Sequence, residues 1–230
     1  MREIKAISFD LDDTLWECDP VIQRAEHSLL EFLTSRCELI RQRYTLERYH
    51  EHKLAFMREN VHLQGDVSRM RQALLRHLLA DCEAHRDLAD EAYAHFYRVR
   101  SQVELYDDSL AALERLSRRY RLAALTNGNA DLHQIGIAGL FSQIHTASLE
   151  CPAKPEAHMF RITCEAFAIE PHQLLHVGDN PETDIEGARN AGAVTVWINR
   201  NAMDWPETLQ PADYEVRDLN ELIELLPVEG

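Results

Sequence analysis

Short apolar runs alternate with helix-like segments at the start of the chain and throughout its second half. The runs are rich in Val, Ile, Leu and Ala, which is typical of strands buried on both faces of a parallel sheet. Strands are predicted at residues 6–10, 122–126, 144–147, 174–177, 195–198 and near 214–216, and helices at 108–118, 156–167, 184–191 and 219–223. The alternation predicts an α/β fold with a Rossmann-like parallel sheet.

A long segment between the first two runs has a different pattern. Proline is absent from residues 21–151, and Gly65 is the only glycine between Thr14 and Thr126. Because these residue types normally interrupt helices, we expect this segment to be helical. Four helices are predicted: one capped by Asp19, one over 45–60, one after the break at Gly65 and one over 88–102. The predicted organisation is an α/β core, residues 1–17 and 104–230, with an inserted all-helical cap, residues 18–103.

Composition excludes several classes of partner. The chain has 230 residues, 45% of them hydrophobic, which is ample for a buried core. A formal net charge of −15 disfavours binding to nucleic acid or to an anionic membrane. There is no apolar run of membrane-spanning length and no signal-peptide pattern, so we expect a cytoplasmic protein, monomeric or homodimeric. Five cysteines without a Cys-x-x-Cys pair predict reduced thiols.

Acidic residues crowd the end of the first predicted strand. Asp10 is its last residue, Asp12 and Asp13 follow within three positions, and Thr14 is next in the chain. Neighbouring carboxylates raise one another's pKa unless a cation offsets their charge, and carboxylate oxygens are ligands that Mg²⁺ prefers. A simple acidic turn is the alternative interpretation. Since ligands bind beyond the carboxyl ends of parallel strands, the position favours a metal site.

Three further polar segments lie at or near strand ends. They are Thr126–Asn129, Ala153–Glu156 and Gly178–Asp184. A hydroxyl followed by glycine-flanked amides suits phosphate oxygens, a lysine adds positive charge, and two more aspartates add metal ligands. Each segment alone is also a common turn or helix-capping sequence. Together they predict a site for a phosphate group and a metal ion.

The order and setting of these segments resemble the four motifs of the haloacid dehalogenase superfamily of phosphohydrolases, whose type 1 caps are inserted between the first and second motifs. The resemblance implies an enzyme that hydrolyses phosphate monoesters with Mg²⁺ as cofactor. The roles it implies are as follows: Asp10 is the nucleophile and Asp12 the general acid and base; Thr126, Asn127 and Lys154 bind phosphate; Asp10, Asp12 and Asp179 bind the metal, with Asp184 in its outer shell.

Asp12 favours phosphatase over dehalogenase activity within this superfamily. The dehalogenating members of the superfamily lack a second aspartate two residues after the nucleophile, because halide leaves without a proton. The sequence around residues 6–22, 125–130 and 175–179 also resembles bacterial phosphatases that act on flavin mononucleotide and on the phosphorylated ribitylaminouracil of riboflavin synthesis. Trp16 is a possible substrate contact, since an indole can stack on a flavin or pyrimidine ring, although core packing is the favoured interpretation.

Other functions stay open. The substrate, a small soluble phosphate ester, could instead be a sugar phosphate, a nucleotide or phosphoglycolate. A protein of another class would keep the pocket as a non-catalytic sensor of a phosphate ligand. A dinucleotide-binding domain is disfavoured because no Gly-x-Gly-x-x-Gly follows the first strand. A receiver domain has no need of a long helical insert.

Overall fold

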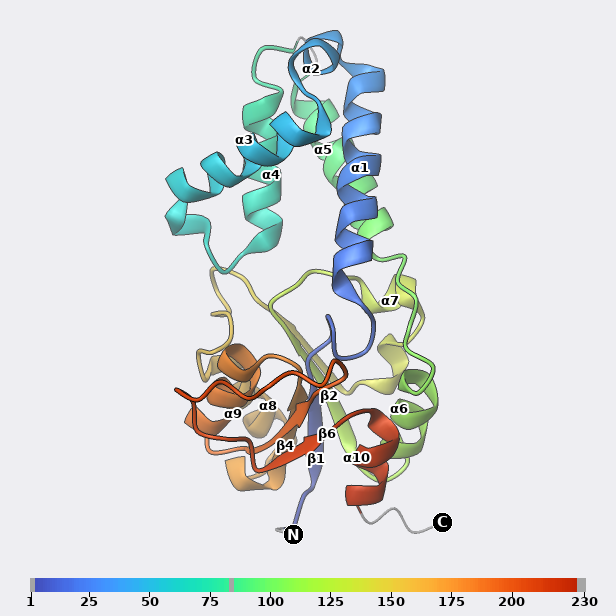
Figure 1. The fold of residues 1–230 in the computed structure, drawn as a ribbon, viewed down its shortest axis with the longest axis vertical. Coiled ribbons are helices and arrows are strands. Elements are labelled where there is room, and N and C mark those ends of the chain that lie inside the picture. Colours follow the sequence, from blue (N-terminus) through green and yellow to red (C-terminus); the bar gives the residue numbers. More distant parts are fainter. Residues whose placement is uncertain (1–2, 83–84, 227–230) are drawn as a thin grey trace. The chain divides into compact units, whose positions relative to one another are not determined.

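The computed structural model describes residues 3–82 and 85–226. The chain forms two compact units, drawn in Figure 1. One comprises residues 1–17, 104–128 and 136–230, and we call it the α/β unit. The other, which we call the helical unit, comprises residues 18–103 and also residues 129–135, which the sequence division had assigned to the core.

The α/β unit is built on a six-stranded parallel sheet with strand order β3-β2-β1-β4-β5-β6. The strands are β1 (Ala6–Phe9), β2 (Arg121–Thr126), β3 (Gln143–Thr146), β4 (Leu174–Gly178), β5 (Val194–Ile198) and β6 (Tyr214–Val216). The α/β fold and each predicted strand are confirmed, with shifts of one residue at some ends. Asp10 is the first residue beyond β1 rather than its last.

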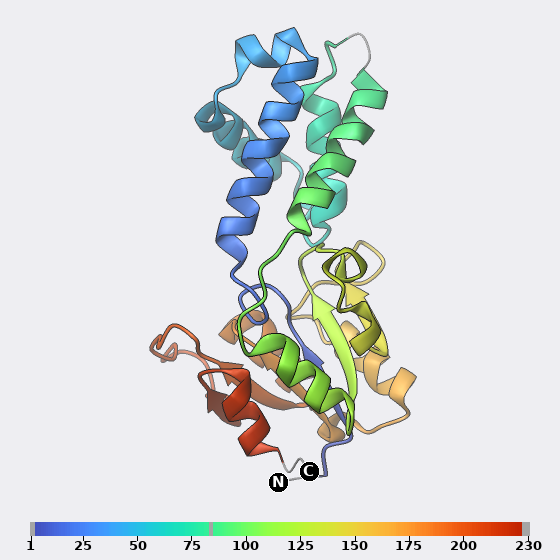
Figure 2. The same cartoon turned by 90° about the vertical axis from the view of Figure 1, so that its right-hand side faces the viewer.

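Helices cover both faces of this sheet. α6 (Ser109–Ser117) and α10 (Leu219–Leu225) lie on one face, and α8 (His158–Phe167) and α9 (Gly187–Asn190) lie on the other (Figures 1 and 2). The helix predicted over 184–191 is shorter than expected, because a π-helical turn, Pro181–Glu186, precedes α9. Short 3-10 turns occur at Ala138–Leu140 and Pro171–Gln173.

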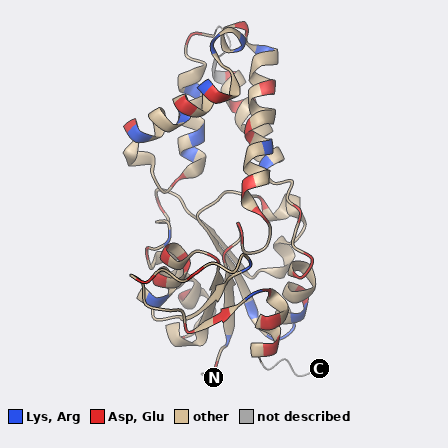
Figure 3. Cartoon of the chain, viewed as in Figure 1, with Lys and Arg blue, Asp and Glu red and all other residues tan. Residues whose placement is uncertain are grey.

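Burial explains why the central strands are so apolar. Every residue of β1, β4 and β5 is buried, and none of the three strands contains Lys, Arg, Asp or Glu. Figure 3 shows that charged residues are sparse on these strands and frequent on the surrounding helices. Strands enclosed on both faces cannot alternate polar and apolar residues, which is why they appear as continuous apolar runs. The polar residues that end these strands therefore stand out.

In its described residues, the helical unit contains the four predicted helices and two short ones. They are α1 (Cys18–Arg36), α3 (Leu46–Glu59), α4 (Val67–Leu78) and α5 (His85–Arg100), with the additional short α2 (Glu38–Arg43). A 3-10 turn at Val61–Leu63 and the short α7 (Leu132–Ile135) complete it. Thr45 and Asp66 cap α3 and α4 by accepting hydrogen bonds from backbone N–H groups. Asp19 lies inside the first turn of α1, so its prediction as the cap is wrong.

The interior of the helical unit is apolar, with a cross-link at its edge. Leu29, Leu33, Leu75 and Phe96 are among its buried residues. Cys37 and Cys82 form a disulfide, so the prediction of five reduced thiols is wrong for this pair. Sequence spacing could not reveal the pair, since 45 residues separate the two cysteines and only the packing of the helices brings them together. No helix in the described part of the chain is long and apolar enough to cross a membrane.

Candidate active site

The candidate site begins where the central strand ends. The backbone N–H of Asp10 donates to the carbonyl of Val177 at 2.9 Å, which continues the pairing of β1 with β4 one residue beyond the strand. The Asp10 side chain is therefore held by a rigid backbone, and the residue is only 7% exposed. Asp179 follows β4 directly, so both aspartates lie at the carboxyl edge of adjacent parallel strands.

Lys154 joins two carboxylates in this site. Its ammonium donates to Oδ1 of Asp10 and to Oδ1 of Asp184, both at 2.6 Å, and its side chain is 1% exposed. Asn127 fixes the lysine backbone, because its side chain accepts from Lys154 N and donates to Lys154 O, each at 2.8 Å. The loop after β2 thus positions the lysine that neutralises the acids beyond β1 and β4.

Three acidic side chains could hold a metal ion. Asp10, Asp179 and Asp184 each offer an oxygen, and these oxygens lie within 4.8 Å of one another. Lys154 supplies one positive charge in direct contact with Asp10 and Asp184, so the group of three carboxylates has a single ammonium beside it. The donor set consists of hard oxygens, and the uncompensated negative charge fits a divalent cation such as Mg²⁺.

The pKa shifts reflect this imbalance. Burial, followed by the charges of Asp184 and Asp13, raises the pKa of Asp179 to about 7. Burial also raises the pKa of Asp10 well above its usual value, against the opposing charge of Lys154. For Asp184, burial acts in the same direction, but Lys154 and His176 outweigh it and lower the pKa. Burial would lower the pKa of Lys154, yet Asp10 and Asp184 raise it, so the lysine stays charged. The acids repel one another enough to favour a cation.

A buried histidine and a glycine determine the position of the Asp184 side chain. His176 lies on β4 with Nε2 at 3.4 Å from Oδ1 of Asp184 and Nδ1 at 2.9 Å from Oγ of Ser8. Because a carboxylate only accepts, we assign the ring proton to Nε2, with the Ser8 hydroxyl donating to Nδ1. A Cβ at Gly178 would overlap the Asp184 side chain, so only glycine lets this carboxylate approach the strand. Burial lowers the pKa of His176, which favours the neutral ring.

Asp12 is outside the group of three acids and is held by Trp16. The indole Nε1 donates to Oδ1 of Asp12 at 2.8 Å, and Trp16 is 0% exposed. The enclosed ring agrees with core packing, the alternative interpretation of Trp16. Contact of Trp16 with a substrate stays a prediction. The ring orients Asp12, a role that the four-residue spacing did not suggest. Metal binding by Asp12 stays a prediction.

The predicted phosphate-binding residues lie at the end of β2. Thr126 is buried, and its Oγ1 accepts from the backbone N–H of Gly128 at 2.9 Å, which leaves the hydroxyl proton to point elsewhere. The Asn127 side chain accepts from Lys154 N and donates one of its two N–H groups to Lys154 O, so it positions the lysine. Phosphate binding by Asn127 stays a prediction. Thr14, next to the first motif, donates to Oδ1 of Asp179 at 3.5 Å.

The profile of the haloacid dehalogenase-like hydrolases matches residues 4–192. The chain belongs to this family. It is 31% identical to the 5-amino-6-(5-phospho-D-ribitylamino)uracil phosphatase YigB of Escherichia coli K12, over 90% of this chain and 89% of that protein. It is 34% identical to a phosphoserine phosphatase of Thermus thermophilus, over 66% of this chain and 63% of that protein.

A solved structure with the same fold is similar over nearly its whole length. The 2-haloacid dehalogenase from Pseudomonas syringae pv. Tomato DC3000 has a TM-score of 0.87 and 31% identity, with 96% of this chain and 97% of that chain covered. Proteins similar to this family member thus carry the names of two reactions, phosphate-ester hydrolysis and dehalogenation. The choice between these two reactions therefore has to be argued from the side chains of the site.

Two positioning residues of this hydrolase were missed in the sequence. Arg200 donates to the carbonyl of Thr14 from Nε at 3.1 Å and from Nη2 at 3.0 Å, and it also pairs with Asp108. Trp197 donates from Nε1 to the carbonyl of Asp179 at 2.7 Å. These residues hold the loops after β1 and β4 from distant parts of the chain. No local pattern marks them, although both lie at or near the end of a predicted strand.

Proposed function

We propose that the protein is a Mg²⁺-dependent phosphomonoesterase that works through an aspartyl-phosphate on Asp10. The observation that carries the proposal is the arrangement of Asp10, Asp179 and Asp184 around Lys154, with three carboxylates clustered about one ammonium. A site of this charge attracts a divalent cation, and a cation together with a lysine attracts a phosphate ester. The substrate class is a small soluble phosphate monoester.

Asp10 acts as the nucleophile in this proposal. Its carboxylate attacks phosphorus, and the bond to the leaving oxygen breaks as the acyl phosphate forms. Mg²⁺, bound by Asp10, Asp12 and Asp179 with Asp184 in the outer shell, would offset the charge of the phosphate. Lys154 and Thr126 bind phosphate oxygens, and Asn127 holds the lysine in place. Because its pKa is raised, Lys154 remains a cation throughout.

Asp12 transfers the proton in this mechanism. An alkoxide leaves only with a proton, so protonated Asp12 donates to the leaving oxygen and then accepts a proton from the water that cleaves the acyl phosphate. The Trp16 indole, at 2.8 Å, keeps the carboxyl group of Asp12 in one orientation. Dehalogenation requires no such group, because halide leaves unprotonated. Asp12 therefore favours phosphatase over dehalogenase activity.

The substrate within this class is proposed from similarity. YigB, which the chain matches over most of both lengths, is named for a phosphorylated intermediate with a ribityl chain and a uracil ring. We infer that flavin mononucleotide or a riboflavin-pathway phosphate is the preferred substrate. Phosphoserine, which names another relative, belongs in the same panel, together with sugar phosphates, nucleotides and phosphoglycolate.

The test is phosphate release from this panel, with Mg²⁺ or with EDTA, and chloride release from a 2-chloro acid. Mg²⁺-dependent phosphate release, lost in the Asp10→Asn variant, is the expected result. Preference for flavin mononucleotide would support the named substrate, whereas broad weak turnover would support the enzyme class alone. Chloride release without phosphate release would replace the proposal with a dehalogenase. Binding of phosphate without turnover would replace it with a sensor.

A further inference from the structure

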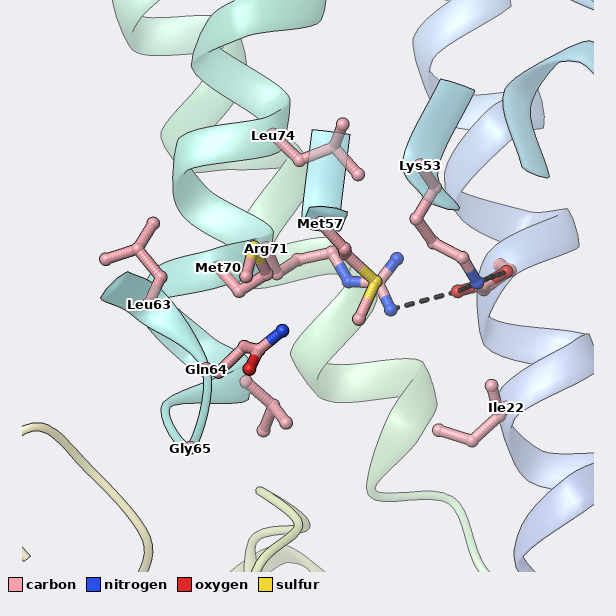
Figure 4. Close-up of a pocket in the computed structure, with 11 residues that line it drawn as sticks. Ile22, Lys53, Met57, Leu63, Gln64, Gly65, Met70, Arg71 and Leu74 are labelled. Carbon is pink, nitrogen blue, oxygen red and sulfur yellow. Dashed lines mark hydrogen bonds and ion pairs between the residues drawn. The ribbon is translucent and has the colours of Figure 1, made fainter. Parts of the chain in front are cut away.

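A cavity of about 270 Å³ lies within the helical unit. Most of its lining is apolar and comes from α1, α3 and α4 and the turn between the last two; Ile22, Met57, Leu63, Met70 and Leu74 all contribute. Figure 4 shows these side chains around an open space. An apolar cavity of about 150 Å³ already accommodates a benzene ring. This cavity therefore has room for one ring or a branched chain together with a polar head.

Three charged side chains, which we call the charged wall, also line this cavity. Glu26, on α1, is 1% exposed, and Lys53 Nζ lies 2.6 Å from its Oε1 and 2.8 Å from its Oε2. Arg71 Nη2 donates to Oε1 of Glu26 at 3.0 Å. Figure 4 shows Lys53 and Arg71 converging from α3 and α4. Burial raises the pKa of Glu26, but the charges of Arg71 and Lys53 outweigh it and the pKa is lowered, so the carboxylate is ionised at neutral pH.

The charges in this wall do not balance. Lys53 and Arg71 contribute two positive charges among the lining residues, and Glu26 contributes the one negative charge. Nε2 of His50 also lies 2.9 Å from Glu26. The site therefore has an excess of one positive charge in a poorly hydrated wall, where an anion is held more strongly than in water.

Arg71 is fixed while it keeps hydrogen-bonding capacity. Its guanidinium lies 4.0 Å above the Phe96 ring, and Nη1 donates to the hydroxyl of Tyr49 at 2.9 Å. A guanidinium has five N–H donors, and those to Tyr49 and Glu26 account for two. The side chain, 14% exposed, is thus a preorganised donor at the edge of the cavity. Preorganised donors lower the cost of binding a ligand.

We propose that this cavity binds a small organic anion. Its carboxylate or phosphate pairs with Arg71 and Lys53, and its apolar body packs against Ile22, Leu63 and Met70. The proposal goes beyond the phosphatase reaction and does not depend on it. Such an anion has two possible sources: the organic part of a substrate ester that carries a second anionic group, or a separate effector molecule.

The first test is binding of 3-phenylpropionate, measured by calorimetry on the full chain. The neutral amide of the same acid is the matched control ligand. The acid is expected to bind at least about tenfold more tightly than the amide, because only the acid meets the excess charge. Equal binding of acid and amide, or no binding of either at millimolar concentration, would overturn the proposal.

Variants of the charged wall sharpen this test. Lys53→Met removes one positive charge at similar length and is expected to weaken acid binding about tenfold, while Lys53→Arg restores it. Glu26→Gln raises the excess charge and is expected to tighten binding of the acid. Arg76→Gln, on the exposed face of the same helix as Arg71, is the control and should bind like the wild type. A purely structural ion cluster predicts no tightening in Glu26→Gln.

Folding of each variant is checked by circular dichroism and thermal unfolding. If the charge variants do not fold, Met57→Phe gives the answer, because Met57 lines the cavity, is 38% exposed and can be enlarged at little cost. This change narrows the cavity and leaves the charges, so it should weaken binding of 3-phenylpropionate; unchanged binding would overturn the proposal.

A phosphatase assay with p-nitrophenyl phosphate distinguishes the two sources of the anion. Competition by 3-phenylpropionate, seen as a higher KM, assigns the cavity to part of the substrate. A changed kcat or unchanged kinetics assigns it to a separate effector. Binding itself is measured equally well on the Asp10→Asn variant, so failure of the phosphatase proposal and failure of this one are distinguishable.

Discussion

Each unit of this protein buries a cluster of charged side chains, and the two clusters have opposite imbalance. In the α/β unit, three carboxylates cluster about the single ammonium of Lys154. In the helical unit, Lys53 and Arg71 share the single carboxylate of Glu26. Burying unequal charge is costly unless a counter-ion completes the set. We conclude that the first cluster is suited to take up a cation and the second an anion.

The two clusters also differ in what holds their charged side chains in place. Strand ends and backbone hydrogen bonds position the acids of the α/β unit, with Asn127 holding the backbone of Lys154. In the helical unit, long side chains from α1, α3 and α4 meet beside a cavity and contact one another through their charged ends. A rigid backbone suits chemistry, where geometry must hold within fractions of an ångström, and a side-chain cavity suits binding.

Among the variants, a change at Asp10, the proposed nucleophile, is expected to have the greatest effect. Asp10→Asn is expected to lower phosphate release by at least about a thousandfold, because an amide does not attack phosphorus. The measurement is the initial rate with p-nitrophenyl phosphate and Mg²⁺. Asp19→Asn, an exposed position, is the control and should keep full activity. Substantial turnover in Asp10→Asn would show that another group is the nucleophile.

Removing the single ammonium of the acidic cluster should destabilise the fold. Lys154→Met leaves the clustered carboxylates without their cation, and the expected loss is about 3–5 kcal/mol in the free energy of unfolding. Mg²⁺ should restore part of this loss, since an ion that binds only the folded state stabilises it. Urea unfolding with Mg²⁺ or EDTA measures both effects. The exposed Lys5→Met is the control; an equal response to Mg²⁺ in both variants would contradict the charge argument.

In the cluster of Glu26, Lys53 and Arg71, the stability lost on removing the carboxylate should depend on pH. Glu26→Gln is expected to cost roughly 3 kcal/mol at pH 7. Because the folded pKa of Glu26 lies below its ordinary 4.5, this stabilisation is complete above pH 4.5 and declines as the pH falls through the folded pKa. Wild type and variant should therefore converge in acid.

Urea unfolding at a series of pH values tests this convergence. Glu31→Gln on the same helix, where Glu31 is exposed, should change the free energy of unfolding by less than about 0.5 kcal/mol. A difference between wild type and Glu26→Gln that stays constant down to low pH would mean that the carboxylate charge is not what stabilises the cluster.

A substitution at Gly178 tests how closely the Asp184 side chain must approach β4, and its expected effect is smaller than those above. A Cβ at Gly178 would overlap the Asp184 side chain, whereas a Cβ at Gly139 would meet nothing within 4 Å. Gly178→Ala should lower the free energy of unfolding by about 1–3 kcal/mol and reduce phosphatase activity. Gly139→Ala is the matched control. Equal stability of the two variants would show that Asp184 moves aside easily.

Local sequence was enough to predict the strands, most of the longer helices and the edge of the sheet where the site lies. The apolar runs are confirmed as strands because a strand buried on both faces admits few polar residues. α2 was missed because its six residues are too few to display a helical period. The π-helical turn before α9 was missed because it shares the capping residues of an ordinary helix start.

Within the candidate site, local sequence located residues better than it assigned their contacts. It placed Asp10, Lys154, Asp179 and Asp184 in one pocket, and the structure brings these four together. It did not foresee that the Asn127 side chain holds Lys154, since that contact spans 27 residues. The roles in catalysis stay predictions that the variants above will test.

Short sequence patterns are sufficient to predict the α/β fold and the acidic and other polar segments at strand ends, because burial and strand order act through such patterns. Which side chains meet depends on tertiary packing. The support of Asp184 by His176, the anchoring of Thr14 by Arg200 and the joining of Glu26 with Lys53 and Arg71 depend on it. These contacts join residues from separate strands and helices, and close packing, which has no local signature, sets their geometry.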